Sequence, residues 1–109
     1  MKVAIVGSRR ITAYDLSAVI PPETTHIISG GARGVDTLAR DYAKTHELPC
    51  TIILPDYHRY GQGAPMRRND EIIALADLVI AIWDGHSHGT RYVIEQCRRL
   101  CKPVCIHQI

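Results

Sequence analysis

The 109-residue sequence contains no phenylalanine and one tryptophan, so its core must be built mainly from aliphatic side chains. Hydrophobic residues make up 46% of the chain, which is enough to fill one core. The formal net charge is only +2, from 13 basic and 11 acidic residues, and so weak a field does not by itself indicate a nucleic-acid partner. We therefore expect one compact domain spanning residues 1–109, close to the commonest domain size.

The sequence also lacks the usual features of secreted, metal-binding and membrane proteins. Its cysteines, Cys50, Cys97, Cys101 and Cys105, include no Cys-x-x-Cys pair, and we interpret them as buried thiols rather than a disulfide framework or a metal site. Met1 leads directly into an apolar strand pattern, so no signal peptide is expected. No apolar run approaches membrane-spanning length. These features predict a cytoplasmic protein with no metal, no cofactor and no membrane association.

Short apolar runs alternate with helical patterns from one end of the chain to the other. Strands are predicted at residues 2–6, 26–29, 50–54, 78–83 and 104–107, and helices at 12–20, 34–47, 64–76 and 89–101. Residues 57–65 are expected to form a long irregular loop that covers the site. In the last helix, the inward-facing residues are expected to be Val93, Ile94, Cys97, Leu100 and Cys101. This alternation predicts an α/β fold with an open five-stranded parallel sheet and helices on both faces.

Three of the predicted strands run directly into turns rich in glycine and hydroxyl side chains. These turns are Gly7-Ser8-Arg9-Arg10, Gly30-Gly31-Ala32-Arg33-Gly34 and the segment from Asp84 to Thr90. Glycine lets a backbone approach a ligand closely, and helix N-termini present free N–H groups to anions. In parallel sheets, ligands bind beyond the carboxyl ends of the strands where the winding direction reverses. A strand order of 3-2-1-4-5 would bring the three turns together and predicts a site for a phosphorylated small molecule.

The candidate ligand contacts come from these turns and from the third helix. They are Gly7, Ser8, Arg9, Gly30, Gly31, Ala32, Gly34, Asp36, Arg68, Asn69, Asp84, Gly85, Ser87, Gly89 and Thr90. Each has a structural alternative: the glycines can simply form tight turns, and the hydroxyl residues can cap helices. Asp36 also suits a first helical turn on electrostatic grounds alone. Trp83 fits a core position better than a base-stacking platform. No dinucleotide or Walker fingerprint is present.

Four motifs together resemble the SLOG superfamily across the whole chain. They are Val-Gly-Ser-Arg at 6–9, Ser-Gly-Gly-Ala-Arg-Gly-Val-Asp at 29–36, Arg-Arg-Asn at 67–69 and Trp-Asp-Gly-x-Ser-x-Gly-Thr at 83–90. The best resemblance within it is to the small YspA/YpsA-like branch, and the LOG phosphoribohydrolases and DprA are relatives. The resemblance implies a Rossmann-like three-layer fold and a nucleotide or ADP-ribose-like ligand. It also implies self-association as a dimer, for which Met66, Ile72 and Ile73 of the third helix are the candidate surface.

The resemblance departs from the LOG enzymes at one position. Their Pro-Gly-Gly-x-Gly-Thr-x-x-Glu motif, aligned on Gly89 and Thr90, places the catalytic glutamate at Val93, whereas the arginine side is retained as Arg67 or Arg68. Glycosidic cleavage needs a carboxylate, and the weak catalytic candidates are Arg68 and Asp84, with Asp36 as the other carboxylate near the site. We therefore expect a sensor or sequestering protein without efficient turnover. The alternative is a nucleoside monophosphate N-glycosidase of the LOG type, and a single-strand DNA binder like DprA is least favoured.

Overall fold

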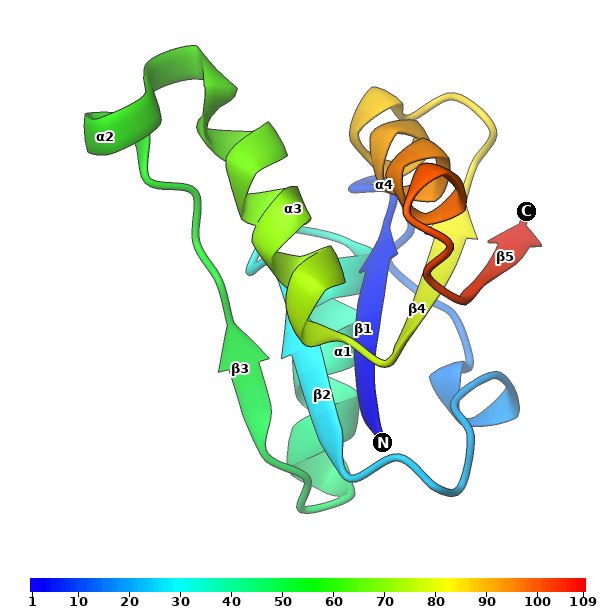
Figure 1. Ribbon diagram of the computed structural model, residues 1–109. Coiled ribbons are helices and arrows are strands. Elements are labelled where there is room, and N and C mark those ends of the chain that lie inside the picture. Colours follow the sequence, from blue (N-terminus) through cyan, green and yellow to red (C-terminus); the bar gives the residue numbers. More distant parts are fainter.

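The computed structural model describes all 109 residues and contains one parallel sheet (Figure 1). Its strands are β1 (Lys2–Gly7), β2 (His26–Ser29), β3 (Cys50–Ile52), β4 (Leu78–Trp83) and β5 (Val104–Gln108). Their order across the sheet is β3-β2-β1-β4-β5, and every neighbouring pair is parallel. This confirms the predicted fold class and strand order. The winding direction therefore reverses between β1 and β4.

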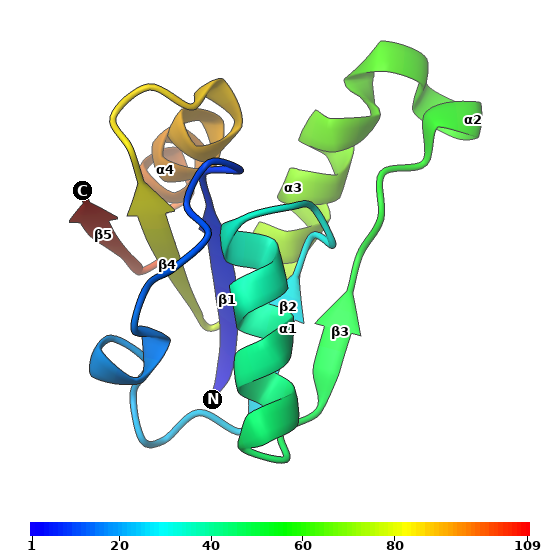
Figure 2. The ribbon, with the colours of Figure 1, turned by 180° about the vertical axis from the view of Figure 1, so that it is seen from behind.

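Helices cover both faces of the sheet, as expected for strands that are buried on both sides. The α-helices are α1 (Val35–Thr45), α2 (Tyr57–Tyr60), α3 (Ala64–Leu75) and α4 (His88–Arg99), and the 3-10 helices are η1 (Leu16–Ala18) and η2 (Gly61–Gly63). In Figure 1, α3 and α4 lie in front of the sheet and α1 lies behind it, and Figure 2 shows α1 from the other side. No helix has the length and apolar character needed to cross a membrane.

Successive residues of β1 enter two different cores, because side chains of a strand alternate between the faces of a sheet. Val3 and Ile5 pack in the core beneath α1, whereas Ala4 and Val6 pack in the core beneath α3 and α4. All four are at most 6% exposed. The aliphatic strand sequence thus explains how a chain without phenylalanine fills two layers.

The helix expected at residues 12–20 is reduced to the single turn η1. The side chain of Asp15 accepts a hydrogen bond from the backbone N–H of Ser17 at 3.1 Å and starts this turn. Ile20 precedes a proline, and this position disfavours the helical conformation. A segment so short, with its own side-chain-to-backbone bonds, forms a turn rather than a helix. The prediction of a helix was therefore wrong in extent.

Residues 57–65, predicted as an irregular loop, instead contain α2, η2 and the first turn of α3. Asp56 caps α2 by accepting a hydrogen bond from the N–H of Arg59 at 3.1 Å. Pro65 lies in the first turn of α3, where its missing N–H has no consequence. None of the residues of α2 and η2 is buried, and the ribbon extends there beyond the edge strand β3 (Figure 1).

The end of α4 and the cysteines also differ from expectation. The helix ends at Arg99, so Leu100 is 52% exposed and Cys101 is exposed rather than inward-facing. The N–H of Lys102 bonds the carbonyl of Cys97, and the N–H of Cys101 bonds that of Arg98, the pattern of a Schellman motif. All four cysteines are free thiols, but only Cys97 is buried. The expectation of four buried thiols is therefore wrong.

Candidate functional site

The turns that follow β1, β2 and β4 meet at one cavity of about 350 Å³ beyond the carboxyl ends of the central strands. The first turns of α3 and α4 complete its walls. The lining residues are Val6, Gly7, Arg9, Arg10, Gly30, Ala32, Asp36, Pro65, Met66, Arg68, Asn69, Ile72, Ser87, His88, Gly89, Thr90 and Val93. The cavity lies where the winding direction of the sheet reverses, which is the position at which open α/β sheets bind ligands.

The structure separates the candidate contacts into two groups. Ten of them line the cavity, namely Gly7, Arg9, Gly30, Ala32, Asp36, Arg68, Asn69, Ser87, Gly89 and Thr90. The other candidates, Ser8, Gly31, Gly34, Asp84 and Gly85, do not line it. The lining residues that sequence reasoning did not name as ligand contacts are Val6, Arg10, Pro65, Met66, Ile72, His88 and Val93. Of these, Ile72 and Val93 lie one helical turn after Arg68 and Gly89, a spacing that could have indicated them.

The N-terminus of α4 opens onto the cavity without a side-chain cap. Ser87 is the N-cap residue, but its side chain makes no capping hydrogen bond. The first intrahelical bond at this end runs from the N–H of Arg91 to the carbonyl of Ser87 at 3.1 Å, so the N–H groups of His88, Gly89 and Thr90 have no helical partner. A Cβ added at Gly89 would meet nothing within 4 Å. The end of this helix therefore offers accessible donors and a positive dipole to an anion.

Asp84 explains why Ser87 does not cap the helix. The Oδ1 atom of Asp84 accepts hydrogen bonds from the backbone N–H groups of His86 and Ser87, both at 2.8 Å, and from the Ser87 hydroxyl at 3.1 Å. These bonds, led by the two backbone N–H groups, hold the pKa of Asp84 well below its usual value. Asp84 is thus an ionised carboxylate that shapes the turn. Its geometry does not suit the role of a proton donor in catalysis.

Ser8 joins the turn after β1 to the turn after β4. Its hydroxyl oxygen accepts a hydrogen bond from the N–H of Asp84 at 3.1 Å and lies 2.8 Å from the hydroxyl oxygen of Ser87. Ser8 is 1% exposed. Its hydroxyl is therefore committed to holding the two loops together beneath the cavity.

Two of the turn glycines, Gly31 and Gly34, are packed closely against other parts of the protein and do not offer space to a ligand. A Cβ at Gly34, which has a φ of +75°, would lie 2.5 Å from the carbonyl oxygens of Ser8 and Arg9. A Cβ at Gly31, with a φ of +72°, would meet the side chains of Ile52 and Leu54. Gly34 therefore lets α1 begin against the turn after β1, and Gly31 faces β3.

Arg68 brings a buried cation to the cavity wall. Its side chain donates hydrogen bonds to the carbonyl oxygen of Gly30 at 2.5 Å and to the Oδ1 atom of Asn69 at 2.9 Å. Both acceptors are neutral, and no carboxylate lies within 4 Å of its guanidinium nitrogens. Burial lowers the pKa of Arg68, and the nearby charge of Asp36 raises it in part. A buried charge without a charged partner is unfavourable, so an anion in the cavity would stabilise it.

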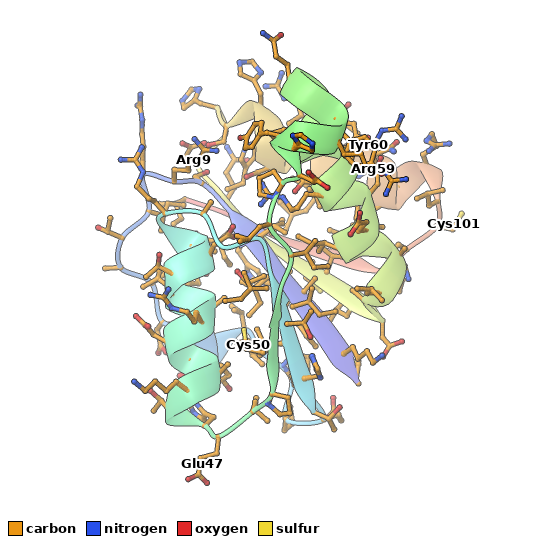
Figure 3. All side chains as sticks on the ribbon, turned by 90° about the vertical axis from the view of Figure 1, so that its left-hand side faces the viewer. Arg9, Glu47, Cys50, Arg59, Tyr60 and Cys101 are labelled. Carbon is orange, nitrogen blue, oxygen red and sulfur yellow. The ribbon has the colours of Figure 1, made fainter.

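Further arginines stand around the same end of the sheet. Arg9 and Arg10 line the cavity. The guanidinium groups of Arg59 and Arg67 lie 5.1 and 5.3 Å from the ring centre of Tyr60, next to the first turn of α3; Figure 3 shows Arg59 beside Tyr60 at the end of the molecule where Arg9 also lies. Arg9, Arg10 and Arg68 therefore bring positive charge to the cavity wall, although the net charge of the chain is only +2.

The residue at the position of the LOG glutamate, Val93, lies in the core. Val93 is 1% exposed and packs in the core beneath the cavity. Glu95 is exposed, as expected for its place on the opposite side of α4. Trp83 packs against the core and donates from Nε1 to the carbonyl of Ser87 at 3.1 Å, and it does not line the cavity. It therefore acts as a core residue rather than a stacking platform.

The fold is that of a small Rossmann-like α/β domain, and the sequence comparisons place it with DprA and the SLOG proteins. A sequence model of the DNA recombination-mediator protein A family matches residues 1–60, and the chain belongs to this family. The chain is also similar to the Gene 61 protein of Mycobacterium phage D29, with 32% identity over 116 residues that cover 94% of this chain and 93% of the phage protein. No solved structure gives a significant match.

Proposed function

We propose that this protein binds a nucleotide or an ADP-ribose-like phosphorylated small molecule in the cavity, as a sensor or sequestering domain. The observation that carries the proposal is the open N-terminus of α4. The N–H groups of His88, Gly89 and Thr90 have no helical partner and favour the binding of an anion at this end of the helix. Gly89 leaves room for a phosphate group to approach. The four motifs at 6–9, 29–36, 67–69 and 83–90 support placing the chain in the small YspA/YpsA-like branch of the superfamily.

The rest of the cavity suits the remainder of such a ligand. Its volume of about 350 Å³ falls within the usual range of small-molecule sites. Pro65 and Met66 provide apolar surface on the α3 side, against which a flat ring can pack. Arg68 supplies a charge that the protein itself leaves without a carboxylate partner.

Binding without efficient turnover is the form of this function that we favour. The LOG glutamate position is the apolar Val93, and Asp84 is held in its turn by three hydrogen bonds. The alternative is an N-glycosidase of the LOG type. It would have to use Asp36, since that is the carboxylate that lines the cavity together with Arg68.

A second candidate is the binding of single-stranded nucleic acid. Arg9 and Arg10 in the cavity wall, and the guanidinium groups of Arg59 and Arg67 beside the ring of Tyr60, favour it. A basic groove with exposed aromatic rings is the usual means of binding single strands. The family name, DNA recombination-mediator protein A, points the same way.

Calorimetric titration of the purified protein with nucleoside mono- and diphosphates and ADP-ribose tests the first proposal. We expect saturable binding of at least one of them, without release of free base in a chromatographic assay of the same mixture. Catalytic release of base would favour the N-glycosidase, and its loss in Asp36→Asn would identify the carboxylate. Salt-dependent binding of labelled single strands, without binding of any mononucleotide, would favour the second candidate.

A further inference from the structure

Asp36 is the acidic residue that lines the cavity, and it lies in the first turn of α1 directly after β2. Its side chain is buried, with the residue 7% exposed. The Oδ2 atom accepts a hydrogen bond from the backbone N–H of Ala32 at 3.0 Å. This bond fixes the orientation of the carboxylate in the turn that follows β2.

The other carboxylate oxygen, Oδ1, accepts no hydrogen bond from the protein. Oδ1 is nevertheless not fully buried. A fully buried side-chain oxygen or nitrogen without a hydrogen-bond partner occurs in this protein at the Thr24 hydroxyl and not at Asp36. Arg68 approaches the same place: a Cβ at Gly30 would lie 2.7 Å from Nη1 of Arg68 and 3.0 Å from Oδ2 of Asp36. However, Nη1 donates to the carbonyl of Gly30, and no ion pair with Asp36 forms. Oδ1 is therefore an acceptor without a protein donor, on a residue that lines the cavity.

The position of Asp36 relative to α4 indicates which donor it would take. Asp36, in the first turn of α1, and Gly89 and Thr90, in the first turn of α4, line the same cavity, although the two helices cover opposite faces of the sheet. β2 and β4 lie on either side of β1, so a ligand that spans the carboxyl end of β1 reaches both groups. A phosphate held at the N-terminus of α4 can therefore be joined to Asp36 by the sugar attached to it. A carboxylate is also the acceptor that binds ribose hydroxyls in other Rossmann folds.

We propose that Asp36 accepts hydrogen bonds from the 2′- and 3′-hydroxyls of a ribose 5′-phosphate, so that the site prefers ribonucleotides to deoxyribonucleotides. This inference rests on the proposed function and specifies its ligand class. In this arrangement the phosphate lies on α4 and the sugar bridges the carboxyl end of β1. The base packs against the apolar surface of Pro65 and Met66 at the rim.

The test compares ligands on the unaltered protein, so it does not depend on a variant that folds. Calorimetry would be carried out with the ribo-, 2′-deoxy- and 3′-deoxy-5′-monophosphates of adenosine, guanosine and cytidine. For the nucleotide that binds best, we expect the deoxy forms to bind about tenfold more weakly, since a hydrogen bond to a charged group is lost. Equal affinity of the ribo and deoxy forms would overturn the inference and leave the proposed function intact.

The variant Asp36→Asn assigns the preference to this residue. The asparagine can still accept the hydrogen bond from Ala32, but it then presents an amide donor to the ligand. We expect the preference for ribose to fall below about twofold, whereas Asp41→Asn, an exposed change on the same helix, keeps it in full. An unchanged preference in Asp36→Asn, or a preference that follows the base instead of the sugar, would overturn the assignment. Binding of none of these nucleotides would overturn this inference, and the proposed function would fall with it only if nucleoside diphosphates and ADP-ribose also failed to bind.

Discussion

The guanidinium group of Arg68 donates a hydrogen bond to the carbonyl oxygen of Gly30, a residue 38 positions earlier in the chain. This bond ties α3 to the turn after β2 and so joins two walls of the cavity. Arg68 is 8% exposed, and its charge is solvated mainly by the neutral acceptors of this turn and of Asn69. The residue therefore has two roles that can be separated by experiment: it holds the shape of the cavity, and it presents a charge within it.

Replacing Arg68 by methionine removes the charge while keeping much of the apolar side-chain volume. We expect the affinity for a phosphorylated ligand to fall about tenfold or more, because a charge-assisted hydrogen bond is worth about 1.5–3 kcal/mol. The free energy of unfolding should fall by about 1–3 kcal/mol, since the Gly30 carbonyl loses its donor. Calorimetry and urea denaturation measure the two effects. The matched control is Arg67→Met at the neighbouring exposed position; the role of Arg68 would be disproved if both variants bound equally well.

Gly89→Val tests the open end of α4. The new side chain meets no protein atom near its Cβ, so the domain should remain folded, but the branched side chain would occupy the place of the phosphate. We expect affinity to fall at least about tenfold in titration calorimetry, as one or more anion hydrogen bonds are lost. Gly63→Val, where a Cβ also meets nothing within 4 Å but which lies outside the cavity lining, should bind normally. Normal binding by Gly89→Val would remove the central observation from the proposal.

Asp84 should make the stability of the domain depend on pH in the acid range. Its hydrogen bonds lower the pKa in the folded protein below the ordinary value of 3.8, so the ionised form stabilises the fold. This contribution is complete above the unfolded pKa and is lost as the pH falls through the folded pKa. Asp84→Ala should therefore destabilise the protein clearly at pH 7 and progressively less below pH 3.8.

Urea unfolding of both proteins across this pH range measures the difference. Asp41→Ala provides the comparison, because that carboxylate is exposed and its nearest cation lies 3.9 Å away on the neighbouring residue. A stability difference between the parent and Asp84→Ala that stayed constant with pH would show that the turn does not depend on the ionised carboxylate.

Glu47 offers a stabilising substitution remote from the cavity. It follows α1 with a φ of 54°, and the N–H of Leu48 bonds the carbonyl of Ala43, which is the Schellman pattern that glycine suits best. Figure 3 shows Glu47 at the opposite end of the molecule from Arg9. We expect Glu47→Gly to raise the free energy of unfolding by about 0.5–1 kcal/mol, because the left-handed conformation no longer carries strain. Thermal denaturation measures this, and Glu47→Ala, which keeps a Cβ, should show no gain.

The packing of α3 does not support the dimer surface that was expected from the sequence. Met66, Ile72 and Ile73 were expected to give α3 more apolar surface than one face of the sheet could cover. Both are fully buried in the core formed with β1, β2, β4 and α4, so the reason for choosing that surface was wrong. Of the three residues named, Met66 alone has substantial exposure, at 41%. Self-association stays a prediction, and light scattering at several concentrations tests it.

The sequence alone determined the layers of this fold and the end of the sheet at which the cavity lies. Runs such as Val3–Val6 and Leu78–Trp83 carry no polar residue, which is typical of strands covered on both faces. Parallel strands joined by helices bring their carboxyl-end turns to one edge. The glycine-rich turns after β1, β2 and β4 were therefore recognisable as neighbours once the strand order was correct.

Only the tertiary structure decided which residues of those turns face the cavity. Gly34 and Gly89 look alike in sequence, but the carbonyls of Ser8 and Arg9 pack against Gly34, whereas Gly89 faces open space. Asp36 and Asp84 likewise differ because one lines the cavity and the other is enclosed by the N–H groups of its own turn. The direction that a turn residue faces depends on the elements packed against it from distant parts of the chain. Local sequence specifies that a turn forms, and long-range packing determines which of its atoms remain free to bind.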